Sequence, residues 1–371
     1  MIDKNIHARS NQSKFDSWLI IASTALVFFG LLAIYDASVV TAFKAFGDKF
    51  YYFKNQLVWA GLGFIALGFF SFYDYHKLLK YSPIYLFATI LLLVAVLIPG
   101  IGVKVYGARR WINIGSFTIQ PSELTKLALI FYQAAIINKF EDFKIRILDV
   151  ALILFLPVFI AALLVLIQPD LGTALIFIAV TIATYFVSKS PIWHFLLAMP
   201  VFVLGAIVMI ITHPYRLARI KAFLDPNFDP QGASYQINQI LSAISAGGLL
   251  GVGIGASRSK FAFIPEVHSD AIFAIIVEEL GFIGALITLS ILVFLFSRAI
   301  KVAKESSDYA GKVLASGIVA LLSIQSLFNL ASIVALVPLT GIPLPFISYG
   351  GSSLLITMSA IGILINIKRQ S

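Results

Sequence analysis

Cysteine is absent from this chain of 371 residues, and charged residues are scarce. Without thiols the protein can form no disulfide, no thiolate zinc site and no cysteine nucleophile. Charged side chains make up 12% of the sequence, about half of the roughly 25% that is usual in soluble domains. Hydrophobic residues make up 60%. This balance argues against a soluble enzyme and predicts an all-α polytopic membrane protein.

Long apolar stretches supply the helices of this fold. A helix needs about 20 apolar residues to cross the hydrocarbon core of a bilayer. We expect about ten transmembrane helices, at 17–35, 56–73, 83–99, 122–138, 149–167, 171–187, 192–211, 271–297, 313–336 and 348–367. The sequence shows no convincing internal repeat, so a single membrane domain over 1–371 is expected, with tails at 1–16 and 368–371 and a large loop at 212–270.

The distribution of Lys and Arg predicts the orientation of these helices. With the N-terminus in the cytoplasm, fifteen Lys and Arg residues fall on the inner side and six in the short outer loops. Because inner loops are enriched in basic residues, this orientation is favoured, and an even number of spans places both termini inside. The net charge of +9 is explained by topology, and no nucleic-acid partner is expected.

Two outer regions are too elaborate to be simple connections. The segment 100–121 has the sequence GIGVKVYGARRWINIGSFTIQP, and the loop 212–270 is far longer than ordinary connections. The loop is rich in Tyr, Phe, Ile and Leu, which argues against disorder. We expect it to contain interfacial helices of its own, one near 235–246.

A polar cluster stands where the long loop enters the next apolar stretch. Glu266, His268 and Asp270 alternate there in PEVHSD. Ionisable groups at a membrane boundary cost free energy unless partners or water satisfy them. The cluster is therefore either a functional site or a polar collar at the start of a helix.

Two further polar motifs lie at the starts of apolar stretches. In QPSELTK, Glu123 and Lys126 are three residues apart and share one helix face. They either form a structural ion pair that joins helices or line a polar cavity that orients a charged substrate. In QPDLGT, Asp170 is expected to cap the following helix, unless its surroundings give it a binding role.

Basic and aromatic residues in the outer regions are candidates for contact with an anionic group. The planar guanidinium of arginine suits phosphate or pyrophosphate, and tryptophan favours the headgroup region. The candidates are Arg109 and Trp111 in GARRWINIG, Arg216 and Arg219 in YRLARIKAFLDP, and Lys260. Interface anchoring and attraction to anionic lipid headgroups are the alternatives.

Glycine and proline mark two irregular segments. The stretch GGLLGVGIG, 247–255, indicates either close helix packing or a mobile loop near a substrate. The stretch VPLTGIPLPFISYGGSS, 337–353, which contains Ser348, predicts an irregular re-entrant segment. Such backbone is tolerated at membrane depth only where it is buried in protein or faces a water-filled cavity. A rigid outer turn is the alternative.

Taken in order, these motifs resemble the SEDS proteins (FtsW, RodA and SpoVE), over roughly residues 17–367. The stretch YQINQILSAISAGGLLGVGIG is more similar to the FtsW and SpoVE branch. The resemblance implies a peptidoglycan glycosyltransferase of the bacterial cytoplasmic membrane that polymerises lipid II. It also implies work with a class B penicillin-binding protein, a transpeptidase, and with other division or elongation proteins.

The resemblance further assigns roles to residues. Asp270 matches the essential acid of the family, and Glu123 and Lys126 match its polar cavity pair. Ala271 and Ser269 depart from the aromatic and the Thr that are usual beside the acid, and both could alter how Asp270 is held. The remaining candidates for substrate binding or the cavity are Arg109, Trp111, Arg216, Arg219, Lys260, Glu266, His268 and Ser348.

The chemistry of such a reaction is consistent with these roles. A carboxylate can act as general base toward the 4-hydroxyl of the acceptor sugar. The departing lipid pyrophosphate needs positive charge from Arg, Lys or a divalent cation, Mg²⁺ or Mn²⁺, which Asp270 could help to hold. No organic cofactor is expected. Two other functions share many of these features: a flippase for lipid II and a non-catalytic scaffold for the transpeptidase.

Overall fold

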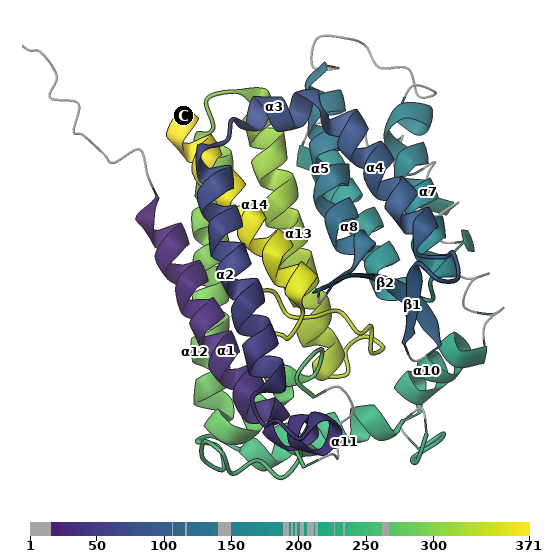
Figure 1. The fold of residues 1–371 in the computed structure, drawn as a ribbon, viewed down its shortest axis with the longest axis vertical. Helices are drawn as coiled ribbons and strands as arrows, with labels where there is room; N and C mark the ends of the chain where they lie inside the picture. Colours follow the sequence, from purple (N-terminus) through teal and green to yellow (C-terminus); the bar gives the residue numbers. More distant parts are fainter. Residues whose placement is uncertain are drawn as a thin grey trace, which may run out of the picture.

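The computed structural model describes most of the chain as a bundle of helices with one small sheet (Figure 1). The described residues are 16–139 except 106 and 116, 150–187, 193, 196, 199–200, 204–205, 211, 214–261 except 226 and 233, and 267–371. The expected span at 192–211 therefore lies almost entirely outside the described residues, as does Glu266.

Five helices among the described residues are long and apolar enough to cross a membrane. They are α1 (Ser17–Phe46), α2 (Tyr51–Phe72), α12 (Ile272–Glu305), α13 (Tyr309–Ile333) and α14 (Gly351–Gln370). Their presence confirms the all-α polytopic membrane class. The helices extend beyond several of the apolar stretches because flanking polar turns continue the helical backbone.

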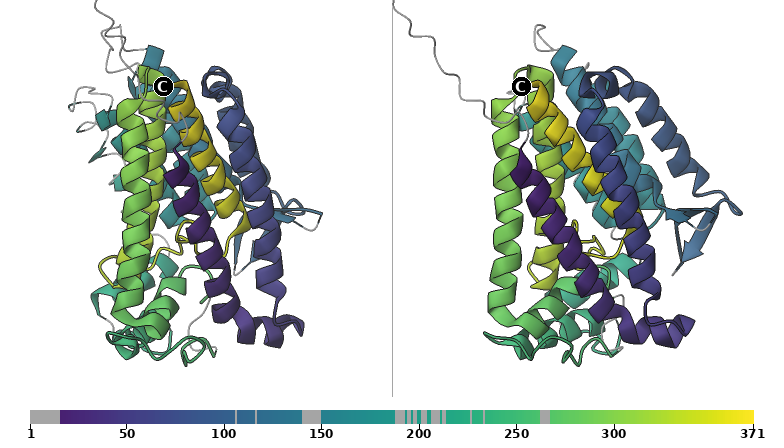
Figure 2. Two further views of the ribbon diagram at one scale, coloured as in Figure 1. Left: turned by 90° about the vertical axis from the view of Figure 1, so that its left-hand side faces the viewer. Right: turned by 60° about the vertical axis from the view of Figure 1, so that its left-hand side comes forward.

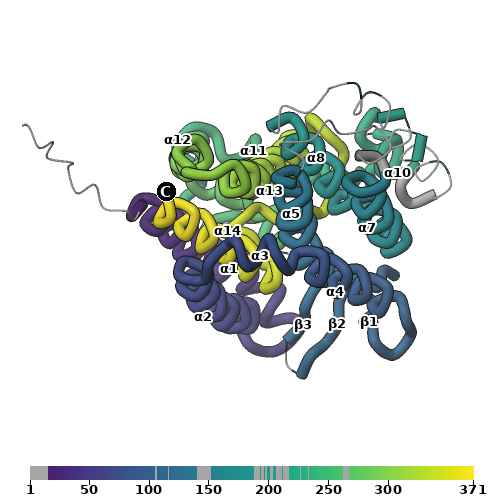
Figure 3. The backbone as a smooth tube through the Cα atoms, turned by 90° about the horizontal axis from the view of Figure 1, so that it is seen from above, coloured from purple at the N-terminus to yellow at the C-terminus, as the bar shows by residue number. Residues whose placement is uncertain are grey.

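Shorter helices complete the bundle beside α13. They are α3 (Tyr75–Lys80), α4 (Ser82–Ala95), α5 (Pro121–Lys139), α7 (Leu156–Ile167) and α8 (Leu171–Val187), with a π-helical turn, η1 (Val150–Phe155), before α7. Helix α5 contacts α4, α8 and α13, so it connects the two halves of the bundle. The view along the bundle in Figure 3 shows α5 between α4 and α13.

Helix α14 lies at the centre of the bundle. It contacts α2 most extensively and also α13, α5 and α1, and Figure 3 shows it between α2 and α13. Its side chains from Ser352 to Ile367 are buried with one exception, Leu355. A helix that is apolar on all sides is stable only when neighbours surround it, which accounts for this central position.

The two ends of the bundle differ in their structure. Helices α10 (Pro214–Leu224) and α11 (Tyr235–Gly247) lie at the end opposite to the C-terminus, together with the irregular segment 334–350 (Figures 1 and 2). Helix α11 confirms the helix expected near 235–246. We call this the loop-bearing end.

A three-stranded antiparallel sheet, which the sequence did not indicate, forms from the first outer region. It consists of β1 (Gly102–Val105), β2 (Ala108–Ile114) and β3 (Phe117–Ile119) in sequential order. Arg110 on β2 donates hydrogen bonds from its guanidinium to the carbonyls of Gln168, at 3.0 Å, and Pro169. The sheet is thereby attached to the turn between α7 and α8.

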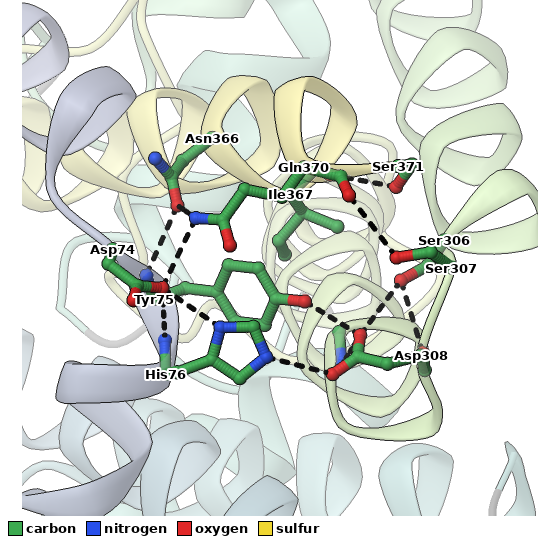
Figure 4. Close-up of polar contacts among 11 residues, drawn as sticks. Asp74, Tyr75, His76, Ser306, Ser307, Asp308, Asn366, Ile367, Gln370 and Ser371 are labelled. Carbon is green, nitrogen blue, oxygen red and sulfur yellow. Dashed lines mark hydrogen bonds and ion pairs between the residues drawn. The ribbon is translucent and has the colours of Figure 1, made fainter.

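A network of hydrogen bonds and ion pairs lies at the opposite end of the bundle, where the C-terminus is (Figure 4). The His76 ring contacts Asp74 Oδ1 at 2.9 Å and Asp308 Oδ2 at 3.1 Å. The Tyr75 hydroxyl donates to Asp308 Oδ1 at 2.6 Å, and the Tyr75 amide donates to Asn366 Oδ1 at 3.1 Å. These bonds join α3 to the start of α13 and to α14.

Candidate functional site

The second half of the irregular segment 334–350 is buried within the loop-bearing end, whereas Val334 and Leu336 near its start are exposed. Ile342, Leu344, Phe346 and Ile347 are all buried side chains of this segment. Helix α1 approaches it closely at Gly30, where an added Cβ would meet the Phe346 carbonyl oxygen at 2.6 Å. The prediction of irregular backbone buried in protein is therefore confirmed for the second half of the segment.

Ser348 and Gln56 fix the end of this segment. The Ser348 hydroxyl accepts a hydrogen bond from the Leu344 amide at 2.8 Å. The Gln56 side chain, on α2, accepts from the Gly350 amide at 3.2 Å and donates to the Ser348 carbonyl at 3.5 Å. Ser348 thus closes a turn in the backbone, and its role toward a substrate stays a prediction.

Asp270 lies in the turn before α12 and is partly exposed. Its carboxylate lies beside Gly341 of the irregular segment, where an added Cβ would come within 3.8 Å of Asp270 Oδ2. The backbone carbonyl of Asp270 accepts a hydrogen bond from Asn329 Nδ2 on α13 at 2.8 Å. Two distant parts of the chain therefore hold this residue at the loop-bearing end.

His268 packs in a cluster of three rings with Tyr52 and Tyr349, whose own centroids are 5.1 Å apart. The centroid of its ring lies 4.1 Å from that of Tyr52 and 5.4 Å from that of Tyr349. The His268 carbonyl accepts a hydrogen bond from the Tyr349 amide at 2.9 Å. The structure thus joins the turn of His268 and Asp270 to the irregular segment through backbone and aromatic contacts.

Lys260 lies in a buried ion cluster. Its Nζ is 2.9 Å from Asp36 Oδ1 on α1 and 2.9 Å from Glu279 Oε1 on α12. Burial lowers the pKa of Lys260, but hydrogen bonds and charges from Asp36 and Glu279 outweigh it, so the pKa lies above its usual value. The ammonium is engaged by two protein carboxylates, and its predicted contact with a pyrophosphate stays a prediction.

The buried carboxylates of Glu278 and Glu279 organise the loop before Lys260. Glu278 Oε2 accepts from the Ser257 hydroxyl at 2.6 Å, and its Oε1 accepts from the Arg258 amide at 3.1 Å. Glu279 accepts from the amides of Gly255, at 3.0 Å, and Ser257, at 3.1 Å. No role for these two residues was predicted from the sequence. Two adjacent acids within an apolar stretch were the available signal.

The glycine-rich stretch packs against a kink in α12. The kink is at Gly281, where φ is 67°. Across it, the Val252 amide donates to the Glu278 carbonyl at 2.9 Å, and the Phe282 amide donates to the Gly248 carbonyl at 2.9 Å. The loop therefore supplies hydrogen-bond partners that the helix loses at the kink. Of the two alternatives for these glycines, close packing is the one observed.

Glu123 and Lys126 form an ion pair inside the bundle. Lys126 Nζ lies 2.7 Å from Glu123 Oε1, and the two residues are 3% and 4% exposed respectively. Lys126 also donates to Gln325 Oε1 on α13 at 2.9 Å. With Gln133 and Thr181 it lines a small internal cavity among α5, α8 and α13. The pair therefore joins α5 to α13, as the first alternative expects, and the orientation of a charged substrate stays a prediction.

The basic candidates from the segments 100–121 and 212–270 lie in two places. Arg109 and Trp111 lie on β2, and both are partly buried. Arg219 on α10 donates from Nη1 to the Leu339 carbonyl at 2.9 Å, which places it at the irregular segment. Arg216 lies on the same helix, and its side chain is outside the described part of the structure.

Asp170 caps α8. Its Oδ1 accepts from the Thr173 amide at 3.0 Å, and its Oδ2 accepts from the Thr173 hydroxyl at 2.8 Å. Capping side chains satisfy amides that have no partner in the first turn of a helix. The expected capping role is confirmed.

A divalent cation at this site would depend on few protein ligands. Among the described residues, no group of three or more His, Asp and Glu side chains is placed to hold a metal ion. Mg²⁺ usually keeps several waters and binds through one or two carboxylates together with substrate phosphates. The single carboxylate of Asp270 fits that mode of binding.

Comparisons with known proteins agree with this architecture. The family model described as "Cell cycle protein" (FtsW, RodA and SpoVE) matches residues 17–371. Stage V sporulation protein E of Bacillus subtilis is 41% identical, over 96% of this chain and 97% of that protein. The probable peptidoglycan glycosyltransferase FtsW of Trichlorobacter lovleyi is 42% identical, over 96% of this chain and 93% of that protein.

Solved structures show the same fold. The rod shape determining protein RodA of Thermus thermophilus superposes with a TM-score of 0.70 at 26% identity, over 97% of this chain and 98% of that chain. A chain from a structure described as "Structural coordination of polymerization and crosslinking by a peptidoglycan synthase complex" superposes with a TM-score of 0.77 at 28% identity. That alignment covers 96% of this chain and 98% of the other.

Proposed function

Because this chain belongs to the FtsW/RodA/SpoVE family of membrane-embedded peptidoglycan glycosyltransferases, we propose that it polymerises lipid II into glycan strands with Asp270 as general base. The observation that carries this assignment is the position of Asp270. Asp270 is partly exposed, its carboxylate lies beside Gly341 at the loop-bearing end, and Asn329 of α13 binds its backbone carbonyl.

The proposed reaction joins two sugars and releases a lipid pyrophosphate. The 4-hydroxyl oxygen of an acceptor GlcNAc forms a bond to the anomeric carbon of a donor MurNAc, and the bond from that carbon to the pyrophosphate breaks. The hydroxyl proton passes to the Asp270 carboxylate, and the pyrophosphate leaves with the electron pair. General-base catalysis of this kind contributes typically about 10²–10⁴-fold to the rate.

The proposed reaction also needs positive charge near the departing pyrophosphate. Arg219 is the best placed of the basic candidates, because its guanidinium contacts the same irregular segment that borders Asp270. Arg109 and Arg216 are proposed from the sequence as further contacts. A divalent cation, if bound, would be held by Asp270 and phosphate oxygens and would neutralise the charge that develops on the pyrophosphate.

We further propose that the loop-bearing end faces outward and that both termini are cytoplasmic. Helix α1 begins and α14 ends at the same end of the bundle (Figure 1), and the excess of Lys and Arg favours that end as the inner side. The absence of cysteine permits a direct test with single-cysteine variants. A membrane-impermeant maleimide should label Asn227→Cys in intact cells and should label Ser307→Cys only after lysis; the reverse pattern would refute this orientation.

The partner we propose is a class B penicillin-binding protein, with other division or elongation proteins around it. Support comes from the similarity to a chain in a complex whose description joins polymerization with crosslinking. Co-purification of a tagged chain should recover such a transpeptidase in a stoichiometric complex. Recovery of the chain alone under mild detergent extraction would argue against a stable complex.

Reconstitution with labelled lipid II tests the reaction. Wild-type protein, with and without its transpeptidase, should produce glycan chains, and Asp270→Asn should be about 10²–10⁴-fold slower. Asp48→Asn, which removes a carboxylate from the turn between α1 and α2, serves as the matched control and should retain the wild-type rate. Transfer of lipid II between leaflets without chains would indicate a flippase instead, and neither activity would indicate a scaffold. Equal rates for Asp270→Asn and the wild type would refute the base assignment.

A further inference from the structure

Helix α13 presents two buried amide side chains to the site. Gln325 and Asn329 are four residues apart, so they lie on one face of the helix. Gln325 is 3% exposed and Asn329 is fully buried. Neither residue was a candidate in the sequence analysis, because mid-helix amides in an apolar stretch carry no motif of their own.

Asn329 binds two backbone carbonyls from different parts of the chain. Its Nδ2 donates to the Ile342 carbonyl at 2.7 Å and to the Asp270 carbonyl at 2.8 Å. One side chain therefore joins the irregular segment to the turn that carries the proposed base. The second junction is the bond from the Tyr349 amide to the His268 carbonyl at 2.9 Å.

Burying the Asn329 amide costs free energy, so the hydrogen bonds that it makes must offset that cost. Its Oδ1 is buried and has no hydrogen-bond partner among the residues that the structure describes. An unsatisfied buried acceptor costs about 1–3 kcal/mol, which a leucine of similar size would avoid. The two carbonyls that Nδ2 binds offset that cost, because irregular backbone at this depth has no helical partners of its own.

Gln325 extends the same arrangement by one turn. Its Nε2 donates to the Pro343 carbonyl at 3.0 Å, next to the carbonyl that Asn329 binds. Its Oε1 accepts from Lys126 Nζ at 2.9 Å, and Lys126 is itself paired with Glu123. The ammonium therefore determines which end of the Gln325 amide faces the irregular segment.

We propose that Asn329 is a positioning residue that sets the Asp270 carboxylate for catalysis, and that Lys126 and Gln325 support it by fixing the adjoining part of the irregular segment. This inference rests on the proposed role of Asp270 as base. Loss of the two hydrogen bonds from Asn329 Nδ2 would let the turn that carries Asp270 shift relative to Gly341 and the irregular segment. A displacement of about 1 Å at a reacting group can lower the rate about 100-fold.

The test uses Asn329→Leu, which removes both donors at similar volume, in the full chain reconstituted with its transpeptidase and lipid II. We expect kcat to fall about 10- to 100-fold with KM for lipid II unchanged, because the change affects the transition state and not substrate binding. Ser326→Ala is the matched control, since Ser326 is a buried polar residue of α13 whose only hydrogen bond within the described part of the chain is to the Leu322 carbonyl of its own helix. It should retain the wild-type kcat.

A double-mutant cycle with Asp270→Asn separates positioning from general structural damage. If Asn329 acts through Asp270, Asn329→Leu should cause little further loss once the carboxylate is gone, whereas independent effects would multiply. Multiplied losses would overturn the proposal, as would a wild-type kcat for Asn329→Leu. If Asn329→Leu does not fold, Asn329→Asp takes its place, because aspartate has the shape of asparagine but lacks the Nδ2 donors. Its kcat and its double-mutant cycle are then judged in the same way.

The same experiment distinguishes failure of this inference from failure of the proposed function. Asp270→Asn at the wild-type rate would refute the assigned base, whatever Asn329→Leu does. An inactive Asp270→Asn together with a fully active Asn329→Leu would refute the positioning role alone.

Discussion

Gly281 and Gly251 meet backbone to backbone at the loop-bearing end. A Cβ at Gly281 would lie 2.3 Å from the Gly251 amide nitrogen, and both residues have positive φ, at 67° and 79°. Glycine is the residue that adopts such φ values without strain. This contact joins the kink in α12 to the loop that leads to Lys260 and Asp270.

Replacing Gly281 by alanine should destabilise the protein. The added Cβ would clash with backbone at Gly251, and alanine would have to adopt φ 67° with ψ −166°, a region nearly restricted to glycine that costs roughly 1–3 kcal/mol. We expect a lower melting temperature in detergent for Gly281→Ala. Gly61→Ala is the control, because a Cβ at that α2 position would meet nothing within 4 Å. Equal melting temperatures for the two variants would contradict this account of the kink.

Replacing Lys260 by methionine should lower stability through the buried ion cluster. The change leaves the carboxylates of Asp36 and Glu279 without their ammonium partner, and breaking a buried pair in this way costs about 3–5 kcal/mol. Lys54→Met is the matched control, because it removes an exposed pair with Asp48 and should leave the melting temperature unchanged. A stable Lys260→Met that has lost activity would instead support contact with the substrate.

For the pair of Glu123 and Lys126, we expect the single and the double variant to differ in melting temperature. Lys126→Met alone leaves a buried carboxylate and should lower the melting temperature strongly. The double variant Glu123→Gln, Lys126→Met removes both charges and should recover most of that stability. The double variant lacks the ammonium that orients Gln325, so we expect its kcat to stay about tenfold below that of the wild type. Recovery of full activity would show that the pair is only a structural ion pair.

His76 should make the C-terminal end of the bundle sensitive to pH. Burial lowers its pKa, but hydrogen bonds and charges from Asp74 and Asp308 outweigh it, so the pKa lies above the usual 6.5. A raised pKa means that the stabilisation is complete below pH 6.5 and is lost as the pH rises through the folded-state pKa. The pKa values of Asp74 and Asp308 are lowered, so both stay ionised over this range.

The measurement compares melting temperatures of the wild type and His76→Gln. The wild type should exceed the variant most at pH 6, and the difference should shrink toward pH 9. A difference that stays constant or grows with pH would show that the charge on His76 does not stabilise the network in Figure 4.

Local sequence patterns predicted the features that depend on neighbouring residues. Apolar stretches gave the class of fold and most of the described helices, since hydrophobic length alone decides whether a helix can span the bilayer. Asp170 is predictable as a cap because it stands in the turn directly before a helix, and its partner Thr173 is only three residues away. The irregular segment and α11 were likewise visible in Pro, Gly and helical spacing.

Features that depend on distant residues were not predictable in this way. Asn329 is separated from Asp270 by 59 positions, so its role appears only when the chain is folded. The sheet β1–β3 was missed because its strands are short and surrounded by apolar helices. The sequence predicts Lys260 as a contact for an anionic group, since no local pattern shows that Asp36, 224 positions away, pairs with it.

The irregular segment has a consequence for how the protein responds to heat. Its carbonyls at Leu339, Ile342 and Pro343 accept hydrogen bonds from side chains of α10 and α13, whereas α14 carries its own repeating backbone ladder. Units held by few bonds open at lower free energy than the remainder of a molecule. Gentle warming should therefore abolish turnover while far-ultraviolet circular dichroism still reports intact helices, and cooling should restore it.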